Sequence, residues 1–481
     1  MTLHKRPGTM KNTLTLLIAA LSLTACGPKE CKIDDPSSCS SDQVCEAVTG
    51  QDKPSCFTPV RVTGKVFDLS TQSKDPIAGA QVTALDDNGA PVSAVVTTAS
   101  DGTYSIPIPS SRADSNGTPV ARKITLRAAA QDFAPFPSGI RTALPLDTGT
   151  ATRAGGSGPY LLSGAGTDVG LAPLDQAERG RPKISGTVDV DATQKGVLVV
   201  AEQTGGTGSN NFASAVADSS GAFTLFNVVP ATYSVRGFSR GVNYTPVDVS
   251  VVAGANNTGV HLVKSTTGTA ALSNKVQTVA GGPPTSIVLA VKSTFNTLLA
   301  RGEVVPGLRA PEPGIAPNVA GNFTIAGIPD GDYMVLAGFE NDGAVRDPDP
   351  GLGGTAIQSI SVRDGAILVQ PSSFKTTTAV NIVSPGAGDL PEDVATATPT
   401  FQWSAYSNAA FFNLELIDEL GVVIWTKTHV TTTQATYDGT TALASGGLYQ
   451  WRATAYRTTS QGDIPTSLTE DLKGVFRVAL P

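Results

Sequence analysis

Asp101-Gly102-Thr103-Tyr104-Ser105-Ile106 is the stretch that decides the fold, because the same phrase returns twice further along the chain. The later copies are Ser220-Gly221-Ala222-Phe223-Thr224-Leu225 and Ala320-Gly321-Asn322-Phe323-Thr324-Ile325. In each copy a glycine supplies the positive φ of a tight turn, and an aromatic residue two places later begins an alternation of inward and outward side chains. The pattern predicts a turn entering a β-strand, repeated three times.

The surroundings of the three copies are also alike. Residues 227–235 and 327–335 each place a proline-anchored turn before a strand with an inward tyrosine, Tyr233 or Tyr333. Upstream, residues 62–68 and 184–188 give an opening strand with a Gly-x-Val element. In the third copy we expect 269–272 to stand in for this element, followed by an insertion through 306–317. Segment 149–170, rich in Gly and Ser, is expected to be a flexible loop or linker.

This succession resembles the carboxypeptidase regulatory-like repeat, a transthyretin-like β-sandwich known from many cell-envelope proteins. The resemblance covers residues 58–136 and 183–264 well, and residues 266–375 in part. It implies structural or binding modules without catalytic residues of their own.

The last hundred residues differ from the repeats, since all three tryptophans, Trp403, Trp425 and Trp451, lie there. Alternating strands and the six-residue spacing from Leu443 to Tyr449 resemble a fibronectin type III-like sandwich over residues 381–481, and the resemblance implies a tyrosine corner at Tyr449.

Composition agrees with an all-β chain, because 50 Gly and 33 Pro accompany only 16% charged residues. The sequence therefore predicts tandem β-sandwich modules of transthyretin-like or Ig-like type. The expected order is a signal peptide at 1–25, a disulfide-rich segment at 26–57, sandwiches at 58–178, 183–265 and 266–375, and the terminal sandwich at 381–481.

The N-terminal segment predicts where the protein resides. Lys5, Arg6 and Lys11 precede an apolar run over 14–23 that is too short to span a bilayer. Leu23-Thr24-Ala25-Cys26 then resembles a bacterial lipobox, which implies cleavage before Cys26 and a lipid on its thiol. Gly27 instead of Asp resembles the outer-membrane sorting preference. The alternative is an ordinary signal peptide that ends in cysteine.

The other four cysteines, Cys31, Cys39, Cys45 and Cys56, fall within 26 residues. In an oxidising envelope this clustering predicts two disulfides in a module too small for a core of its own, with three pairings open. A zinc knuckle is the alternative, although the spacings include no C-x-x-C pair.

Charge and motifs exclude several functions. The formal charge is −7 and no basic stripe is present, so nucleic acid is not expected as a partner. His261 and His429, both expected at surface or edge positions of strands, are the only histidines of the mature chain. Ser372-Ser373-Phe374-Lys375 matches S-x-x-K but lacks the partner motifs, so we expect no catalytic residues and no enzyme.

Two groups of residues remain as candidate sites. Glu340, Asp342, Asp347 and Asp349 form an acidic run that could hold calcium, although solvated loop acids are the commoner case. Trp425 and Tyr456 are the best candidates for an aromatic platform that binds a ligand, with a core position as the alternative for Trp425. No other cofactor is expected.

These features predict a non-enzymatic, lipid-anchored outer-membrane protein facing the periplasm or the cell surface. Its modules in series would form a stalk, or a binding module for polysaccharide or another envelope protein through loops such as 110–122, 205–212 or 340–354. The alternatives are an accessory subunit of a hydrolase or peptidase complex, and a periplasmic assembly factor that engages chains by strand addition.

Overall fold

The computed structural model describes residues 1–2 and 30–480, apart from residues 34, 87–88, 139–142, 157, 191–195, 206–210, 280–285, 296–301, 312–318, 339–357, 372–373, 378, 389–390, 419–421, 461 and 471–472. Regular structure in the described residues is β except for short 3-10 helices: η1 (Pro36–Ser38), η2 (Thr148–Thr150), η3 (Ala165–Thr167), η4 (Gln176–Glu178) and η5 (Lys292–Thr294). No helix among them is long and apolar enough to cross a bilayer. The strands form one small hairpin and four two-sheet units, which confirms the all-β, tandem-sandwich prediction.

The first sandwich packs a sheet of order β11-β3-β10-β9, with β6 also paired to β3, on a sheet of order β5-β4-β7-β8. Its strands are β3 (Val60–Asp68), β4 (Gln81–Leu85), β5 (Val96–Thr97), β6 (Thr103–Ile108), β7 (Lys123–Ala129), β8 (Leu146–Asp147), β9 (Thr152–Arg153), β10 (Tyr160–Leu162) and β11 (Val169–Leu171).

The second sandwich packs the sheet β15-β12-β18 on the sheet β14-β13-β16-β17. Its strands are β12 (Ile184–Val188), β13 (Val197–Gln203), β14 (Phe212–Ala217), β15 (Ala222–Leu225), β16 (Thr232–Phe238), β17 (Val247–Ser250) and β18 (Asn257–Leu262).

The third sandwich packs the sheet β22-β19-β26 on the sheet β21-β20-β23-β24-β25. Its strands are β19 (Ala270–Val279), β20 (Ser286–Val291), β21 (Val304–Ala310), β22 (Asn322–Ile328), β23 (Gly331–Gly338), β24 (Gln358–Arg363), β25 (Ala366–Ile367) and β26 (Phe374–Thr377).

The C-terminal sandwich packs the sheet β27-β29-β32 on the sheet β28-β35-β33-β30-β31, with β34 also paired to β33. Its strands are β27 (Ile382–Ser384), β28 (Glu392–Val394), β29 (Thr400–Trp403), β30 (Phe411–Asp418), β31 (Val423–Val430), β32 (Gln434–Thr436), β33 (Leu448–Thr459), β34 (Gly462–Leu468) and β35 (Val475–Val478). The limits of all four sandwiches as separate domains stay predictions.

The first three sandwiches share one pairing scheme. The opening strand pairs antiparallel with the strand after the glycine turn and parallel with the last strand of the unit. A valine N–H of the opening strand donates to the carbonyl of the turn glycine: Val66 to Gly102 at 2.9 Å, Val188 to Gly221 at 2.9 Å and Val276 to Gly321 at 3.0 Å. The sequence repeat is therefore a repeat of topology.

The glycine of each copy does not always have the expected conformation. Gly102 and Gly221 have φ of +74° and +83°, and each donates its N–H to the carbonyl three residues earlier. Gly321 does not have positive φ, so that prediction is wrong for the third copy. The inward tyrosines are confirmed, because Tyr233 and Tyr333 are buried and donate their hydroxyls to the carbonyls of Val229 and Pro329 at 2.8 Å.

Three local predictions are corrected by strand pairing. Segment 149–170 is not a linker, because β10 and the start of β11 run parallel to β3 and bury Leu162 and Val169. The third opening element lies at 272–276 rather than 269–272, because Leu272 and Val276 fill the inward positions. Residues 306–310 belong to β21, which pairs with β20, so this part of the expected insertion is sheet.

The cysteine-rich segment forms a hairpin of β1 (Val44–Glu46) and β2 (Ser55–Phe57). Disulfides join Cys31 to Cys45 and Cys39 to Cys56, so the four thiols are consumed by two bridges, as favoured over zinc.

A buried ion pair joins this hairpin to the first sandwich. Arg112, 1% exposed, bonds the Glu46 carboxylate through its Nε and donates to the carbonyls of Gly117 and Thr58 at 2.8 and 2.9 Å. The Ser110 N–H donates to Glu46 at 2.7 Å. Burial raises the pKa of Glu46, and the Arg112 charge offsets this only in part. The hairpin is thus fixed to the sandwich.

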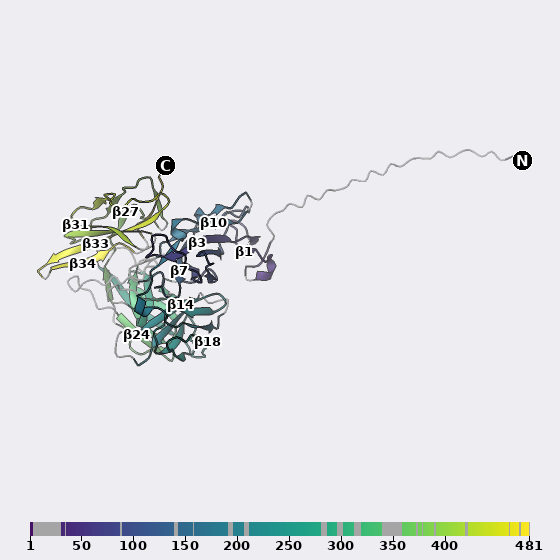
Figure 1. The fold of residues 1–481 in the computed structure, drawn as a ribbon, viewed down its shortest axis with the longest axis horizontal. Coiled ribbons are helices and arrows are strands. Elements are labelled where there is room, and N and C mark those ends of the chain that lie inside the picture. Colours follow the sequence, from purple (N-terminus) through teal and green to yellow (C-terminus); the bar gives the residue numbers. More distant parts are fainter. Residues whose placement is uncertain are drawn as a thin grey trace.

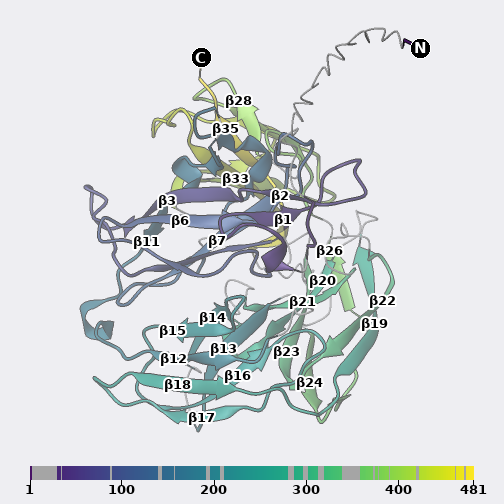
Figure 2. The ribbon, with the colours of Figure 1, turned by 90° about the vertical axis from the view of Figure 1, so that its right-hand side faces the viewer.

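The sandwiches do not form a linear series. Leu448 and Val475 of the C-terminal sandwich belong to the same buried cluster as the core of the first sandwich. Leu198 and Phe238 of the second sandwich share a cluster with the core of the third. In Figure 1 the first and C-terminal sandwiches lie side by side. Figure 2 shows the first sandwich, with β3 and β7, between the C-terminal sandwich above it and the second sandwich below it. The modules therefore pack against one another instead of extending in series, because apolar side chains at the unit surfaces bury one another.

One polar junction joins the first three sandwiches. Arg127 of β7 donates to both carboxylate oxygens of Glu303, just before β21, at 3.0 and 2.9 Å. Ser214 of β14 donates to the same carboxylate at 2.5 Å. Burial raises the pKa of Glu303, but the Arg127 charge and these hydrogen bonds outweigh it, so the pKa lies below its usual value. One residue from each sandwich therefore meets at a single charged contact.

Candidate functional site

A row of three rings lies on the outer face of the larger sheet of the C-terminal sandwich. Phe411 of β30 stacks on Tyr456 of β33, with ring centroids 5.1 Å apart and planes 5° apart. His429 of β31, the strand on the other side of β30, also stacks on Phe411, with ring centroids 4.1 Å apart and planes 14° apart. We call Tyr456, Phe411 and His429 the ring row. Because Phe411 is 6% exposed while the His429 side chain is 68% exposed, the histidine is the open end of the row.

Strand register explains two of the three rings. Phe411 and Tyr456 are direct cross-strand partners, so both side chains leave the sheet on the same side. Their neighbours Phe412 and Ala455 alternate inward into the core.

A β-bulge explains the third ring. The register between β30 and β31 shifts between Phe412, paired with Val430, and Leu414, paired with Lys427. His429 lies in this bulge with φ of +55°, and its N–H donates to the Asn413 side chain at 3.0 Å. A non-glycine residue at positive φ stores strain, and such strain often accompanies a functional role. The bulge directs the imidazole across Phe411.

The polar surroundings of the row are limited. His429 Nε2 lies 3.9 Å from a carboxylate oxygen of Asp463, whose other oxygen accepts from Thr458 at 2.8 Å. The flat exposed face of His429, beside a carboxylate and hydroxyls, suits a ligand with both apolar and hydroxyl faces, such as a sugar ring.

The two predicted aromatic candidates, Tyr456 and Trp425, lie in different environments in the structure. Tyr456 lies in the ring row, partly exposed. Trp425 is a core residue, 7% exposed, whose ring packs on Phe401 and Tyr437 and whose Nε1 donates to Asp438 at 2.9 Å. It offers no platform, because its strand turns it inward opposite Leu416. The Tyr449 hydroxyl bonds the backbone nearby, as expected, since it accepts from the Ala444 N–H at 2.8 Å.

The remaining predicted residues contribute no described site. Cys26, the four acidic candidates for calcium at 340, 342, 347 and 349, and Ser372 and Ser373 lie outside the described residues. His261 is exposed on β18 and bonds Asp189 at 2.8 Å, far along the chain from the ring row. Within the described part of the chain, the cluster of potential metal ligands consists of Cys31, Cys39 and Cys45, which are already in disulfides.

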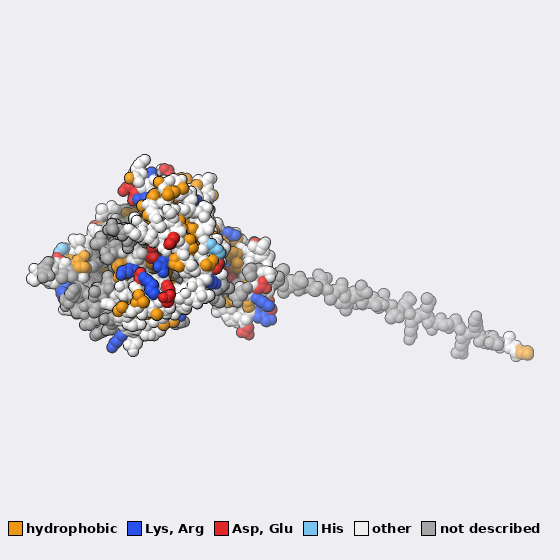
Figure 3. Space-filling model, turned by 90° about the horizontal axis from the view of Figure 1, so that it is seen from below, with side chains coloured by type: hydrophobic (Ala, Val, Ile, Leu, Met, Phe, Trp, Pro, Cys, Tyr) orange, Lys and Arg blue, Asp and Glu red, His pale blue; other side chains and the backbone are white. Residues whose placement is uncertain are grey.

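Sequence reasoning missed Phe411 and the role of His429. The available signal was the alternation of residues 411–417, which places Phe411 on the outer face of the sheet when Phe412 points inward. Nothing in the sequence marks the bulge. On the face seen in Figure 3, basic and acidic side chains are interspersed without a basic patch.

Comparison with known protein families and with curated proteins finds no match. Solved structures similar to this chain include a streptococcal ancillary pilin, at 11% identity, 66% of this chain, 98% of the other and a TM-score of 0.17. The shaft pilin SpaA from Lactobacillus rhamnosus GG matches at 13% identity over 43% of this chain and 97% of its own, with a TM-score of 0.17. Two B repeat units of the collagen-binding protein of Staphylococcus aureus match at 12% identity over 87% and 98%, also with a TM-score of 0.17. Sequence identities and TM-scores this low support no argument about function.

Proposed function

We propose that this protein is a non-catalytic, lipid-anchored component of a bacterial envelope that binds polysaccharide through the ring row of its C-terminal sandwich. The observation that carries the proposal is the exposed, bulge-directed His429 stacked on Phe411 and Tyr456. Removing an apolar ring face from water favours binding, and the row is already assembled before any ligand arrives.

The proposed lipid anchor would fix the orientation of the folded body. A lipid on Cys26 would lie four residues before Glu30, which pairs with Ser55 in the folded hairpin. Four residues span at most about 14 Å when extended, so the body would lie close to the membrane. In Figure 1, β31, β33 and β34 lie on the side of the molecule away from β1. The strands β31 and β33, which carry His429 and Tyr456, would therefore lie on the side of the body away from the proposed anchor.

Packing of the sandwiches favours a binding body over a stalk. The first and C-terminal sandwiches share a buried cluster, so the chain does not extend in the way that a linear spacer does.

The test is retention of the soluble mature chain, secreted with Cys26→Ser, on insoluble envelope polysaccharide. We expect retention of the natural sequence and about tenfold weaker binding for Tyr456→Ala and His429→Ala, the loss typical of one aromatic contact. His261→Ala is the matched control, because that histidine is also exposed beside a carboxylate. Equal binding by all variants would refute the ring row as the site. Capture of one defined envelope protein instead would favour an assembly factor, and co-purification with a hydrolase or peptidase would favour an accessory subunit.

Protease treatment of intact cells, with detection of residues 381–481, distinguishes the two possible faces. Loss of the signal would place the ring row at the cell surface. Protection until the outer membrane is opened would place it in the periplasm.

A further inference from the structure

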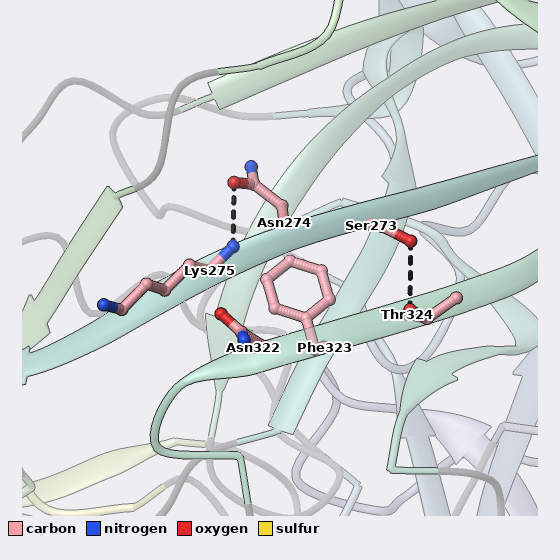
Figure 4. A pocket seen from close by; sticks show the side chains of 6 residues that line it. All are labelled: Ser273, Asn274, Lys275, Asn322, Phe323 and Thr324. Atoms are coloured by element: carbon pink, nitrogen blue, oxygen red, sulfur yellow. Dashed lines mark hydrogen bonds between the residues drawn. The ribbon is translucent and has the colours of Figure 1, made fainter.

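The ring row requires three side chains from neighbouring strands to lie on one face of the sheet. The hollow between β19 and β22 of the third sandwich, drawn in Figure 4, shows how strand alternation usually prevents this. Its central pair, Asn274 and Phe323, lies on the buried side of the two strands. The pairs on either side of it are exposed: Ser273 with Thr324, and Lys275 with Asn322. Successive residues of a strand face opposite ways, so the lining residues of this hollow do not form one platform.

Strand β31 would likewise place His429 on the inner face of its sheet if the ladder were regular. Lys427 pairs with Leu414 of β30, and an unbroken register from this pair would set His429 opposite Phe412. Phe412 points into the core, so His429 would point there as well. The observed partner of Phe412 is instead Val430, because the bulge adds one residue to β31. The extra residue therefore puts Val430 in the core and His429 on the face of the ring row.

The bulge also changes the partner of one backbone N–H. Two residues of β31, Thr428 and His429, lie opposite Asn413 of β30. The His429 N–H donates to the Oδ1 atom of Asn413 at 3.0 Å, so a side-chain oxygen replaces a ladder carbonyl. Residues with a side chain rarely adopt the φ of +55° found at His429, and this hydrogen bond offsets part of the strain. Asn413 therefore stabilises the bulge.

The place of Asn413 in β30 connects the bulge to the other two rings. Asn413 is two residues from Phe411, so the two side chains leave the sheet on the same side. Its partner on β33 is Thr454, which is two residues from Tyr456. The Asn413 side chain thus lies on the face of the ring row and reaches across to β31.

We infer that Asn413 is the positioning residue of the ring row: its side-chain oxygen holds the bulge through the His429 N–H, and the bulge holds the imidazole against Phe411. The inference rests on the proposed function, since it assigns a role within the same polysaccharide site. Asn413 acts through His429, whose open face is the part of the row that meets the ligand.

The first test measures the position of His429 without a ligand, by NMR of the soluble mature chain at one fixed pH. The Phe411 ring, with its centroid 4.1 Å from that of the imidazole, should shift the carbon-bound imidazole protons of His429 upfield. Asn413→Ala should move these resonances to the positions of an exposed histidine. His261, the only other histidine of the mature chain, supplies that reference.

Two further variants control for a general loss of structure. Asn413→Asp keeps an oxygen acceptor for the His429 N–H and should retain the upfield shift. Thr426→Ala should also retain it, because Thr426 is exposed on the same strand but lies outside the bulge. Asn413→Val has no acceptor and favours strand structure, so it provides the same test if the alanine variant does not fold.

The second test measures retention on insoluble envelope polysaccharide. Asn413→Ala should bind about tenfold more weakly, as His429→Ala does, and Asn413→Asp should bind like the natural sequence. The double variant of Asn413→Ala and His429→Ala should bind no more weakly than His429→Ala alone, because both changes remove the same contact.

The two tests separate this inference from the proposed function. Unshifted His429 resonances in a folded Asn413→Ala or Asn413→Val protein would overturn the positioning role, even if the natural chain binds polysaccharide. Additive losses in the double variant would overturn it as well. The expected resonance shifts in a chain that binds no polysaccharide would support the positioning role and refute the proposed function.

Discussion

At the residue scale, the most constrained contact is the ion pair of Glu46 and Arg112. Both side chains are nearly inaccessible, at 3% and 1% exposure, and the guanidinium also satisfies two backbone carbonyls. Removing the Glu46 carboxylate from water is unfavourable. The buried charge is tolerated because the Arg112 guanidinium and the Ser110 N–H surround it. The pair therefore stabilises one arrangement of the hairpin and the first sandwich.

Arg112→Ala should destabilise the protein by about 3 to 5 kcal/mol, because it leaves the Glu46 carboxylate buried without its countercharge. Denaturant unfolding measures the change. Arg61→Ala is the control, since that arginine bonds the Ser105 hydroxyl at 3.3 Å near the surface and has no ion pair among the described residues. Similar stability of the two variants would show that the buried pair does not hold the hairpin.

At the scale of the element, the closest backbone contact of the opening strand determines how that strand can pair. Gly186 lets β18 pass over β12, and the N–H groups of both strands then find partners in a parallel ladder. In the third sandwich the same position is Asn274, which pairs with Phe323. The absence of a side chain at Gly186 therefore permits the close parallel pairing of β18 in the second sandwich.

Gly186→Ala should destabilise the second sandwich by about 1 to 3 kcal/mol, because the new methyl would overlap the Val260 carbonyl and displace β18. Hydrogen exchange of 184–188 and 257–262 should become faster. Gly268→Ala is the matched control, since nothing lies within 4 Å of its Cβ position and its φ is ordinary. Unchanged exchange in Gly186→Ala would contradict the role given to this glycine.

At the scale of the whole molecule, the junction of Arg127, Glu303 and Ser214 joins three sandwiches. Because the folded state holds the pKa of Glu303 below its ordinary value of 4.5, its stabilisation is full above that value. It is lost as the pH falls through the lower, folded-state pKa. Acid should therefore loosen the packing between the sandwiches.

Small-angle scattering of the soluble mature chain should give a radius of gyration of about 22 Å at neutral pH, the value of a compact body of this length. The radius should become larger in acid, once the pH falls through the lowered pKa of Glu303. Glu303→Gln should cost about 1 to 3 kcal/mol at pH 7, discounted because the pair is only partly buried, and the difference should vanish in acid. Glu415→Gln, at an exposed position of the C-terminal sandwich, is the control. An expanded chain at pH 7 would refute the packed arrangement.

Part of the candidate site could be read from the sequence. Tyr456 was predicted to be an exposed aromatic residue, and it follows the alternating stretch 449–453, in which side chains point to opposite faces whatever the strand pairs with. Phe411 and His429 could not be placed beside it, because their meeting depends on the register of three strands and on a bulge. The local order of residues determines neither the strand register nor the position of the bulge.

The sequence by itself determined the all-β class, the threefold repeat, the inward tyrosines and the clustering of the cysteines. These follow from turn glycines, side-chain alternation and short spacings, all of which act between near neighbours in the chain. Only the tertiary structure decided that segment 149–170 closes the first sandwich and that the sandwiches pack together. Each of these depends on contacts between residues far apart in the sequence, where the fit of one surface to another, and not a local pattern, sets the free energy.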